Sequence, residues 1–102
     1  MVTHVIIVTG SIRARPDTVE QIEALSLAHV RRSREEPGCV LHSVHRDVED
    51  GRRFVFLEHW VDAESLRAHF QLAASAAFVA EVAALADANP TIEIYQATAT
   101  SV

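Results

Sequence analysis

The strongest constraint on the fold is a hairpin pattern in the middle of the chain. Residues 39–45 and 54–60 each follow the period-two spacing of a strand, and the polar run 47–53 separates them. The pattern predicts two antiparallel strands joined by a polar turn. A helix is expected directly after them, because Asp62 is a favoured N-cap residue and apolar residues follow it at helical spacing.

The second strand of this hairpin predicts a candidate site. Side chains alternate along a strand, so Phe56, Glu58 and Trp60 are expected on one face, near the start of the helix. If Glu58 is buried there, desolvation would raise the pKa of its carboxyl group and suit it to general-base work. The alternative for Glu58 is a structural salt bridge or hydrogen bond. Trp60 could stack on a flat substrate, although a tryptophan at a strand end more often belongs to a core or an interface.

Apolar periodicity on either side of the hairpin predicts the remaining elements. Residues 4–12 form a nearly continuous apolar run, typical of a strand buried on both faces, and 17–35 predict a helix that opens with a capping box at Asp17. The second helical region is expected to be split, with its second part over 75–86, and 91–98 predict a last strand. The element order is then β-α-β-β-α-β, an α+β ferredoxin-like fold with an antiparallel sheet.

Length, charge and cysteine content narrow the class of protein. The 102 residues are predicted to form a single domain over 1–102, with a core over about 4–98. A formal net charge of -5 argues against nucleic acid as a partner, because phosphate binding requires clustered cations. The lone Cys39 fits a reducing compartment, and the first apolar run is too short to span a bilayer. We therefore expect a cytoplasmic protein with no membrane partner.

One face of the predicted sheet has no helices to cover it. This face would carry Val40, Val44, Val55 and Leu57, or the residues of opposite parity. So much apolar surface is unfavourable in water and usually marks an association site. We expect a homodimer in which the free sheet faces of two subunits pack against each other.

Several motifs resemble one known family in their order and spacing. They are EPGC at 36–39, RD at 46–47, FVFLEHW at 54–60, D-x-E-S-L at 62–66 and FVAEVAAL at 78–85. Together they resemble the antibiotic biosynthesis monooxygenase domain, over roughly residues 5–95. The resemblance implies a dimeric α+β barrel of ferredoxin-like subunits, each with a pocket between its sheet and its helices.

The members of this family differ in what they do. They include cofactor-independent oxygenases that act on quinols, anthrones and other electron-rich aromatics, as well as haem-degrading enzymes and proteins with no known activity. Glu58 and Trp60 match the family's E-x-W sequence, whose tryptophan lines the pocket. Haem-degrading relatives also use an asparagine on the first strand and a histidine on the later helix. This chain has Gly10 and no histidine over 73–88, so no haem is expected. No other cofactor is expected either, because its three glycines are isolated and form no phosphate-binding loop.

Histidines supply the remaining candidate residues. His69 could take a proton from a phenol, since imidazole titrates near neutral pH, or it could be a satisfied polar residue at the helix edge. His29 lies on the inward stripe of its helix and has the same two interpretations, and His45 stands where relatives often carry an aromatic residue. His42 and His45 are three residues apart on a strand and so face opposite ways, which argues against a shared metal ion. No metal is expected.

The combined expectation is a monooxygenase that needs no cofactor and oxidises a small electron-rich aromatic, such as a quinol or an anthrone, with dioxygen. The resemblance implies that the protein removes a hydroxyl proton and that the resulting anion passes an electron to dioxygen. His69 or Glu58 would be the catalytic base, and the substrate would contact Trp60, Phe56, His29 and His45. Two alternatives stay open: a non-catalytic dimer that binds a small molecule or a partner protein, and an isomerase built on the same barrel.

Overall fold

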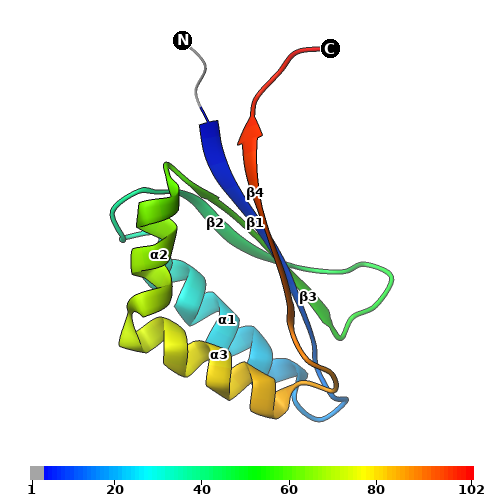
Figure 1. Ribbon diagram of the computed structural model, residues 1–102. Coiled ribbons are helices and arrows are strands. Elements are labelled where there is room, and N and C mark those ends of the chain that lie inside the picture. The colour runs from blue at the N-terminus through cyan, green and yellow to red at the C-terminus, as the bar shows by residue number, and fades with distance from the viewer. Residues whose placement is uncertain (1–3) are drawn as a thin grey trace.

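The computed structural model describes residues 4–102. Their elements are, in order, β1 His4–Arg13, α1 Val19–Ser33, β2 Cys39–Arg46, β3 Arg53–Trp60, α2 Ala63–Gln71, α3 Ala73–Leu85 and β4 Thr91–Thr98. The strands form one antiparallel sheet in the order β2-β3-β1-β4, and the helices lie on one of its faces (Figure 1). The predicted α+β ferredoxin-like fold, with its second helical region split, is confirmed.

The first helix starts differently from the prediction. The capping box predicted at Asp17 is wrong, because Thr18 is the N-cap residue of α1 and its side chain makes no cap hydrogen bond. Instead, Oγ1 of Thr18 accepts a hydrogen bond from the backbone N–H of Arg15 at 2.9 Å and donates one to the carbonyl of Leu85 at 2.7 Å. A hydroxyl can do both. The start of α1 is thereby tied to the end of α3.

The predicted cap of α2 is present. The side chain of Asp62 accepts a hydrogen bond from the backbone N–H of Ser65 at 2.8 Å. Gly38 packs against the same turn: its φ is +83°, and a Cβ atom there would lie 2.2 Å from Oγ of Ser65. Only glycine meets both conditions without strain. The turn before β2 therefore lies directly against the first turn of α2.

The two short helices α2 and α3 are separated by a sharp break at Leu72, whose backbone is extended. Within the described range 4–102, no single helix is long and apolar enough to cross a membrane. α2 and α3 reach that length only when taken together, and they are bent by 70° relative to each other. The bend allows each helix to turn its own buried side chains toward the sheet.

The sheet face that meets the helices carries the core. Along β3 every second residue from Phe54 to Trp60 is buried, as the predicted alternation requires. Trp60 packs with Val8 and Leu66 in one cluster, and Phe54 belongs to a larger cluster with residues of α1 and α3. Glu58 lies between these two aromatic residues on the same face. A charged residue is therefore set into a hydrophobic layer.

The free face of the sheet differs from the predicted one. Grouping Val44 with Val55 and Leu57 is wrong, because Val44 pairs with a buried residue of β3 and packs against the core. On β2 the residues of opposite parity, such as Leu41, share the free face with Val55 and Leu57. The register shifts at a bulge next to Leu41, which the amino-acid pattern does not indicate.

Candidate active site

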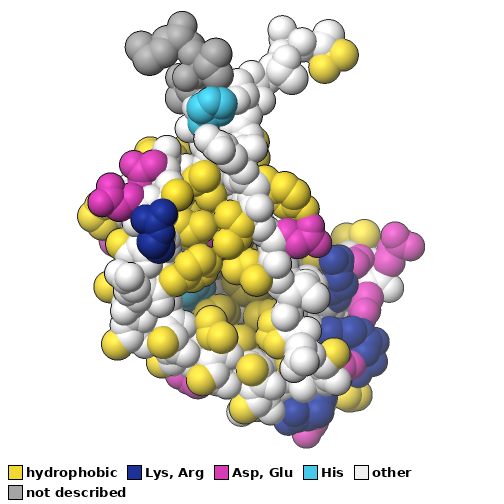
Figure 2. All heavy atoms as spheres, in the orientation of Figure 1, with side chains coloured by type: hydrophobic (Ala, Val, Ile, Leu, Met, Phe, Trp, Pro, Cys, Tyr) yellow, Lys and Arg dark blue, Asp and Glu magenta, His cyan; other side chains and the backbone are white. Residues whose placement is uncertain are grey.

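A cavity of about 230 Å³ lies between the sheet and the helices. In Figure 2 apolar side chains surround a hollow that opens between the helices and β4. Histidine and glutamate side chains line one end of the cavity. The apolar part of the wall includes Val8, Ile12, Phe56, Phe78, Val82 and Ile92. A pocket thus lies where the resemblance implied one.

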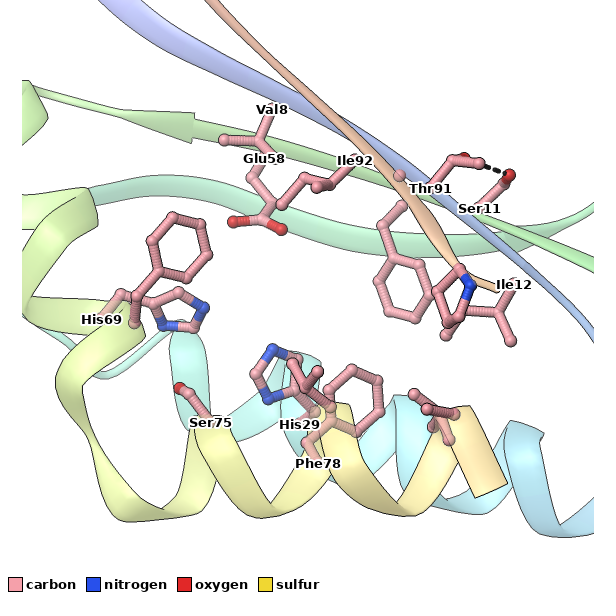
Figure 3. A pocket seen from close by; sticks show the side chains of 17 residues that line it. Val8, Ser11, Ile12, His29, Glu58, His69, Ser75, Phe78, Thr91 and Ile92 are labelled. Carbon is pink, nitrogen blue, oxygen red and sulfur yellow. Dashed lines mark hydrogen bonds between the residues drawn. The ribbon is translucent and has the colours of Figure 1, made fainter. Parts of the chain in front are cut away.

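Glu58 is the buried carboxylate at the polar end. Its side chain points away from the sheet, toward the rings of His69 and His29 (Figure 3). Oε1 accepts a hydrogen bond from Nε1 of Trp60 at 2.9 Å and lies 3.3 Å from Nε2 of His42. Burial acts to raise the pKa of Glu58, but the contacts with His42 and Trp60 outweigh it and hold the pKa below its usual value. The raised pKa predicted for this group is wrong, and Glu58 is an anion at neutral pH.

His69 comes from α2 and is held by a second carboxylate. Its Nδ1 lies 2.8 Å from Oε1 of Glu36, which follows α1 in the chain. An ionised carboxylate only accepts hydrogen bonds, so Nδ1 carries the hydrogen, and in the tautomer with hydrogen on Nδ1 alone Nε2 has a free lone pair. Trp60 packs beside the ring, with centroids 4.8 Å apart. His69 is thereby held in one tautomer and one orientation.

His29 comes from α1 and lies against the aromatic wall. Its ring stacks on Phe78, with centroids 4.0 Å apart and planes within 3° of parallel. Its centroid is 5.4 Å from that of His42 and 5.2 Å from that of His69. Burial, together with the two neighbouring histidines, lowers the pKa of His29 to about 3. His29 is therefore a neutral imidazole at physiological pH.

His42 comes from β2 and completes a cluster of three buried rings. It pairs with Glu58 across the hairpin, and its side chain is 0% exposed. Neither of its ring nitrogens makes a hydrogen bond of good geometry, although Nε2 lies near Glu58. Three imidazoles from three different elements thus surround one carboxylate. We call His29, His42, His69 and Glu58 the polar cluster.

Most of the predicted site residues line the pocket, and Trp60 does not. The four that line it are Phe56, His29, Glu58 and His69. The side chain of Trp60 is fully buried behind the polar cluster, with its N–H bound to Glu58. Trp60 is not among the residues that line the pocket, and its N–H contacts the pocket wall only through the carboxylate of Glu58.

His45 is separated from the other predicted site residues. It is exposed on the opposite face of the sheet, and its Nε2 lies 3.0 Å from Oγ of Ser43. The predicted alternation explains this place, because it turns His42 and His45 to opposite faces. The structure does not bring His45 to the pocket.

Two residues of the site were missed by reasoning from the sequence. Glu36 is separated from His69 by 33 positions, and no local pattern joins them. Placing His42 beside Glu58 requires the register of the hairpin, in which Arg46 pairs with Phe54. The polar run 47–53 lies between these two residues. If Arg46 and Phe54 are assumed to pair at its two ends, His42 falls opposite Glu58.

Comparison with family models identifies the chain. The model of the family described as antibiotic biosynthesis monooxygenase matches residues 5–81. The chain belongs to the antibiotic biosynthesis monooxygenase family. The match includes the whole polar cluster and Glu36, and it confirms the resemblance noted in the sequence.

Solved structures of similar proteins have the same ferredoxin-like fold as this family member. A solved antibiotic biosynthesis monooxygenase superposes with a TM-score of 0.84 at 24% identity, over 90% of this chain and 97% of that chain. Protein SO0527 from Shewanella oneidensis gives a TM-score of 0.88 at 19% identity, over 96% and 95% of the two chains. Protein sll1783 from Synechocystis sp. is 39% identical over 66 residues, which are 65% of this chain and 45% of that protein. The chain therefore spans about half the length of this curated relative.

Proposed function

We propose that the protein is a cofactor-independent monooxygenase that oxidises a small electron-rich phenol, of the quinol or anthrone class, with dioxygen. Membership of the monooxygenase family supports the reaction class. The observation that carries the proposal is the pair formed by Glu36 and His69 at the polar end of an apolar pocket. An oriented imidazole beside an apolar cavity is suited to deprotonating a phenol.

His69 is the proposed catalytic base. Its Nε2 takes the hydroxyl proton, while Glu36 holds the Nδ1 hydrogen and stabilises the imidazolium that forms. The nearby carboxylate of Glu58 favours that positive charge in the same way. The low pKa of Glu58 makes its carboxylate a weak base, so we assign Glu58 to charge stabilisation and give proton transfer to His69.

After the proton is removed, the substrate itself reacts with dioxygen. The phenolate passes an electron to dioxygen, and the two radicals combine to form a carbon–oxygen bond. For an anthrone-like substrate a ring CH2 group becomes a carbonyl, one oxygen atom enters the product, and the other leaves as water with the two hydrogens. The substrate supplies all four electrons, so the balance requires no external reductant. An apolar wall keeps water away from the anion and holds the reactants together.

The size of the pocket limits the substrate. Pockets for drug-sized ligands usually measure about 300–1,000 Å³, and an apolar cavity of about 150 Å³ can hold a benzene molecule. At about 230 Å³, this pocket suits a compact aromatic of a few rings at most, with its hydroxyl directed to His69. The ring would then contact Phe56 and Phe78, which line the wall.

The proposed enzyme works as a homodimer in the cytoplasm. Apolar residues of β2 and β3 on the free face of the sheet support the dimer, because helices cover only the other face. The free thiol of Cys39 supports a reducing compartment. A small aromatic substrate is the expected partner of the apolar pocket.

Oxygen uptake tests the proposal. Purified protein treated with a chelator is mixed with a panel of anthrones and quinols, and dioxygen consumption is compared with the spontaneous rate. We expect His69→Gln to lower turnover by at least about 100-fold, because a positioned base contributes about that much. His4→Gln is the matched control, since His4 is exposed at the start of β1, and it should keep full turnover.

Other outcomes of this experiment support the alternatives. Exchange of a substrate proton with solvent deuterium, without oxygen consumption, would mean that the same base serves an isomerase. Binding of the aromatic without exchange or consumption would mean a binding protein. Either outcome contradicts the proposed oxygenation.

A further inference from the structure

Three imidazole rings converge in the interior from three separate elements. His29 lies on α1, His42 on β2 and His69 on α2. Their exposed fractions are 5%, 2% and 2%, and one possible ligand atom from each lies within 4.8 Å of the other two. His42 and His45, which are close in sequence, face opposite sides of the sheet. The three converging rings are distant in sequence, so spacing along the chain does not reveal them.

The hydrogen bonds of these rings leave several nitrogens unused. Buried polar atoms in proteins almost always have a hydrogen-bond partner. Both ring nitrogens of His42 are buried and lack one, and the bond to Glu36 occupies only Nδ1 of His69. Each neutral imidazole has one nitrogen lone pair, which is what a metal ion requires. The cluster therefore has buried ring nitrogens without a hydrogen-bond partner, and these nitrogens could bind a metal ion.

The surroundings of the rings resemble those of metal-binding histidines. Such histidines usually donate their second ring N–H to a carboxylate, as Nδ1 of His69 does to Glu36 at 2.8 Å. Glu58 adds an oxygen donor and a negative charge, with Oε1 3.3 Å from Nε2 of His42. Trp60 holds that carboxylate through its N–H. The buried carboxylate of Glu58 and the partly buried carboxylate of Glu36 favour a positive charge between the three imidazoles.

We propose that His29, His42 and His69 bind one divalent transition-metal ion of the Zn²⁺, Co²⁺ or Ni²⁺ class, with Glu58 next to the fourth position. Imidazole nitrogens are preferred ligands of these ions. Metal–nitrogen bonds of about 2.0–2.1 Å place tetrahedral ligands roughly 3.4 Å apart, so the rings must move together by up to roughly 1.4 Å. Rotation of each ring about its side-chain torsions can supply that movement.

This site goes beyond the proposed oxygenation and does not depend on it. The ion would occupy the lone pair on Nε2 of His69, which the proposed reaction uses for the proton. Metal and proton therefore compete for one atom, and Zn²⁺ should inhibit oxygen uptake at concentrations that fill the site. Failure of the oxygenation would leave the metal site standing, because metal binding is measured without any aromatic compound.

Titration of the chelator-treated full chain with Co²⁺ and Zn²⁺ tests the site. We expect one ion per chain by calorimetry, visible absorption typical of tetrahedral Co²⁺, and a melting temperature that rises with Zn²⁺. His42→Gln and His29→Gln should each weaken binding by at least tenfold. His45→Gln is the matched control, because His45 lies on the same strand as His42 and faces away from it. Circular dichroism of each metal-free variant checks that it is folded.

NMR signals of the imidazole rings can be followed in the original protein, so this measurement does not depend on whether a variant folds. Adding Zn²⁺ should shift the ring signals of His29, His42 and His69 together and leave those of His4 and His45 unchanged. The proposal is wrong if the folded chain binds no ion, if binding is indifferent to both His42→Gln and His29→Gln, or if only exposed histidines respond.

Discussion

At the residue scale, Glu58 combines a charge with a buried position. Its side chain is 9% exposed, and an unpaired carboxylate at such a position would cost several kcal/mol. The N–H of Trp60 and the ring of His42 offset that cost, and they hold the pKa of Glu58 low in spite of burial. Trp60 therefore affects the site through Glu58, although it does not reach the pocket.

Replacing Trp60 tests this positioning role. Trp60→Phe removes the N–H that Glu58 accepts and leaves a small cavity, so we expect a loss of about 2 kcal/mol in the free energy of unfolding. Urea denaturation measures it. With an anthrone as substrate, kcat should fall while KM stays close to its original value. Phe56→Leu alters the pocket wall and should instead raise KM. A raised KM with unchanged kcat in Trp60→Phe would show that the indole contacts substrate.

At the element scale, α2 carries His69 and owes its position to its first turn. Asp62 caps the helix through Ser65, and Gly38 allows the preceding turn to lie against that cap. The same turn begins with Glu36, so the packing of 36–38 on α2 brings Glu36 to His69. A local cap thus supports a contact between residues that are far apart in the sequence.

The cap of α2 should make stability depend on pH. Hydrogen bonds from the backbone and side chain of Ser65 lower the pKa of Asp62 below its ordinary value of 3.8. A group with a lowered folded-state pKa stabilises the fold above its unfolded-state pKa, and this contribution is lost as pH falls through the folded-state pKa. Asp62→Ala should therefore lower the melting temperature by a few degrees at pH 7, with a smaller difference below about pH 3.

Asparagine at the same position provides the control for this prediction. Asn caps helices about as well as Asp but does not titrate, so Asp62→Asn should keep most of the stability at pH 7. It should also lose less stability than the original protein on acidification. Equal acid sensitivity of the two proteins, measured by thermal melting across this range, would contradict the assigned role of the carboxylate.

At the scale of the whole molecule, the sheet is covered by helices on one face only. Leu41, Val55 and Leu57 lie on the other face, where their cross-strand partners are His59, His45 and Ser43. β4 forms one edge of the sheet and exposes Ile92 and Ile94 on the face that carries the pocket. The apolar residues of β2 and β3 on the uncovered face are the ones on which the proposed dimer rests.

A charge in the free face should break the proposed dimer. Leu57→Glu would place a carboxylate in an apolar interface, where desolvation is costly, so we expect monomers at concentrations where the original protein is dimeric. Sedimentation velocity measures this change. Val48→Glu makes a similar apolar-to-acidic change in the fully exposed hairpin turn and should leave the dimer intact. A dimer that survives Leu57→Glu with its native circular dichroism would move the interface elsewhere.

Features with a local physical cause were predictable from the sequence. Three such features are the alternation of β3, the cap at Asp62 and the break between α2 and α3. Each depends on residues that are close together in the sequence. They were sufficient to place Glu58 and Phe56 on one buried face. The start of α1 was mispredicted because Thr18 bonds to Leu85, a partner that no local rule supplies.

The order of the elements, the buried face of β3 and the family could be predicted from neighbouring residues, because periodicity, caps and motifs are local features. Which histidines meet could not, because it depends on tertiary packing. The register of β2 on β3 brought His42 to Glu58 and left His45 outside, and the packing of a turn on α2 joined Glu36 to His69. Such contacts depend on how whole elements pack, and packing is set by the combined burial of many side chains.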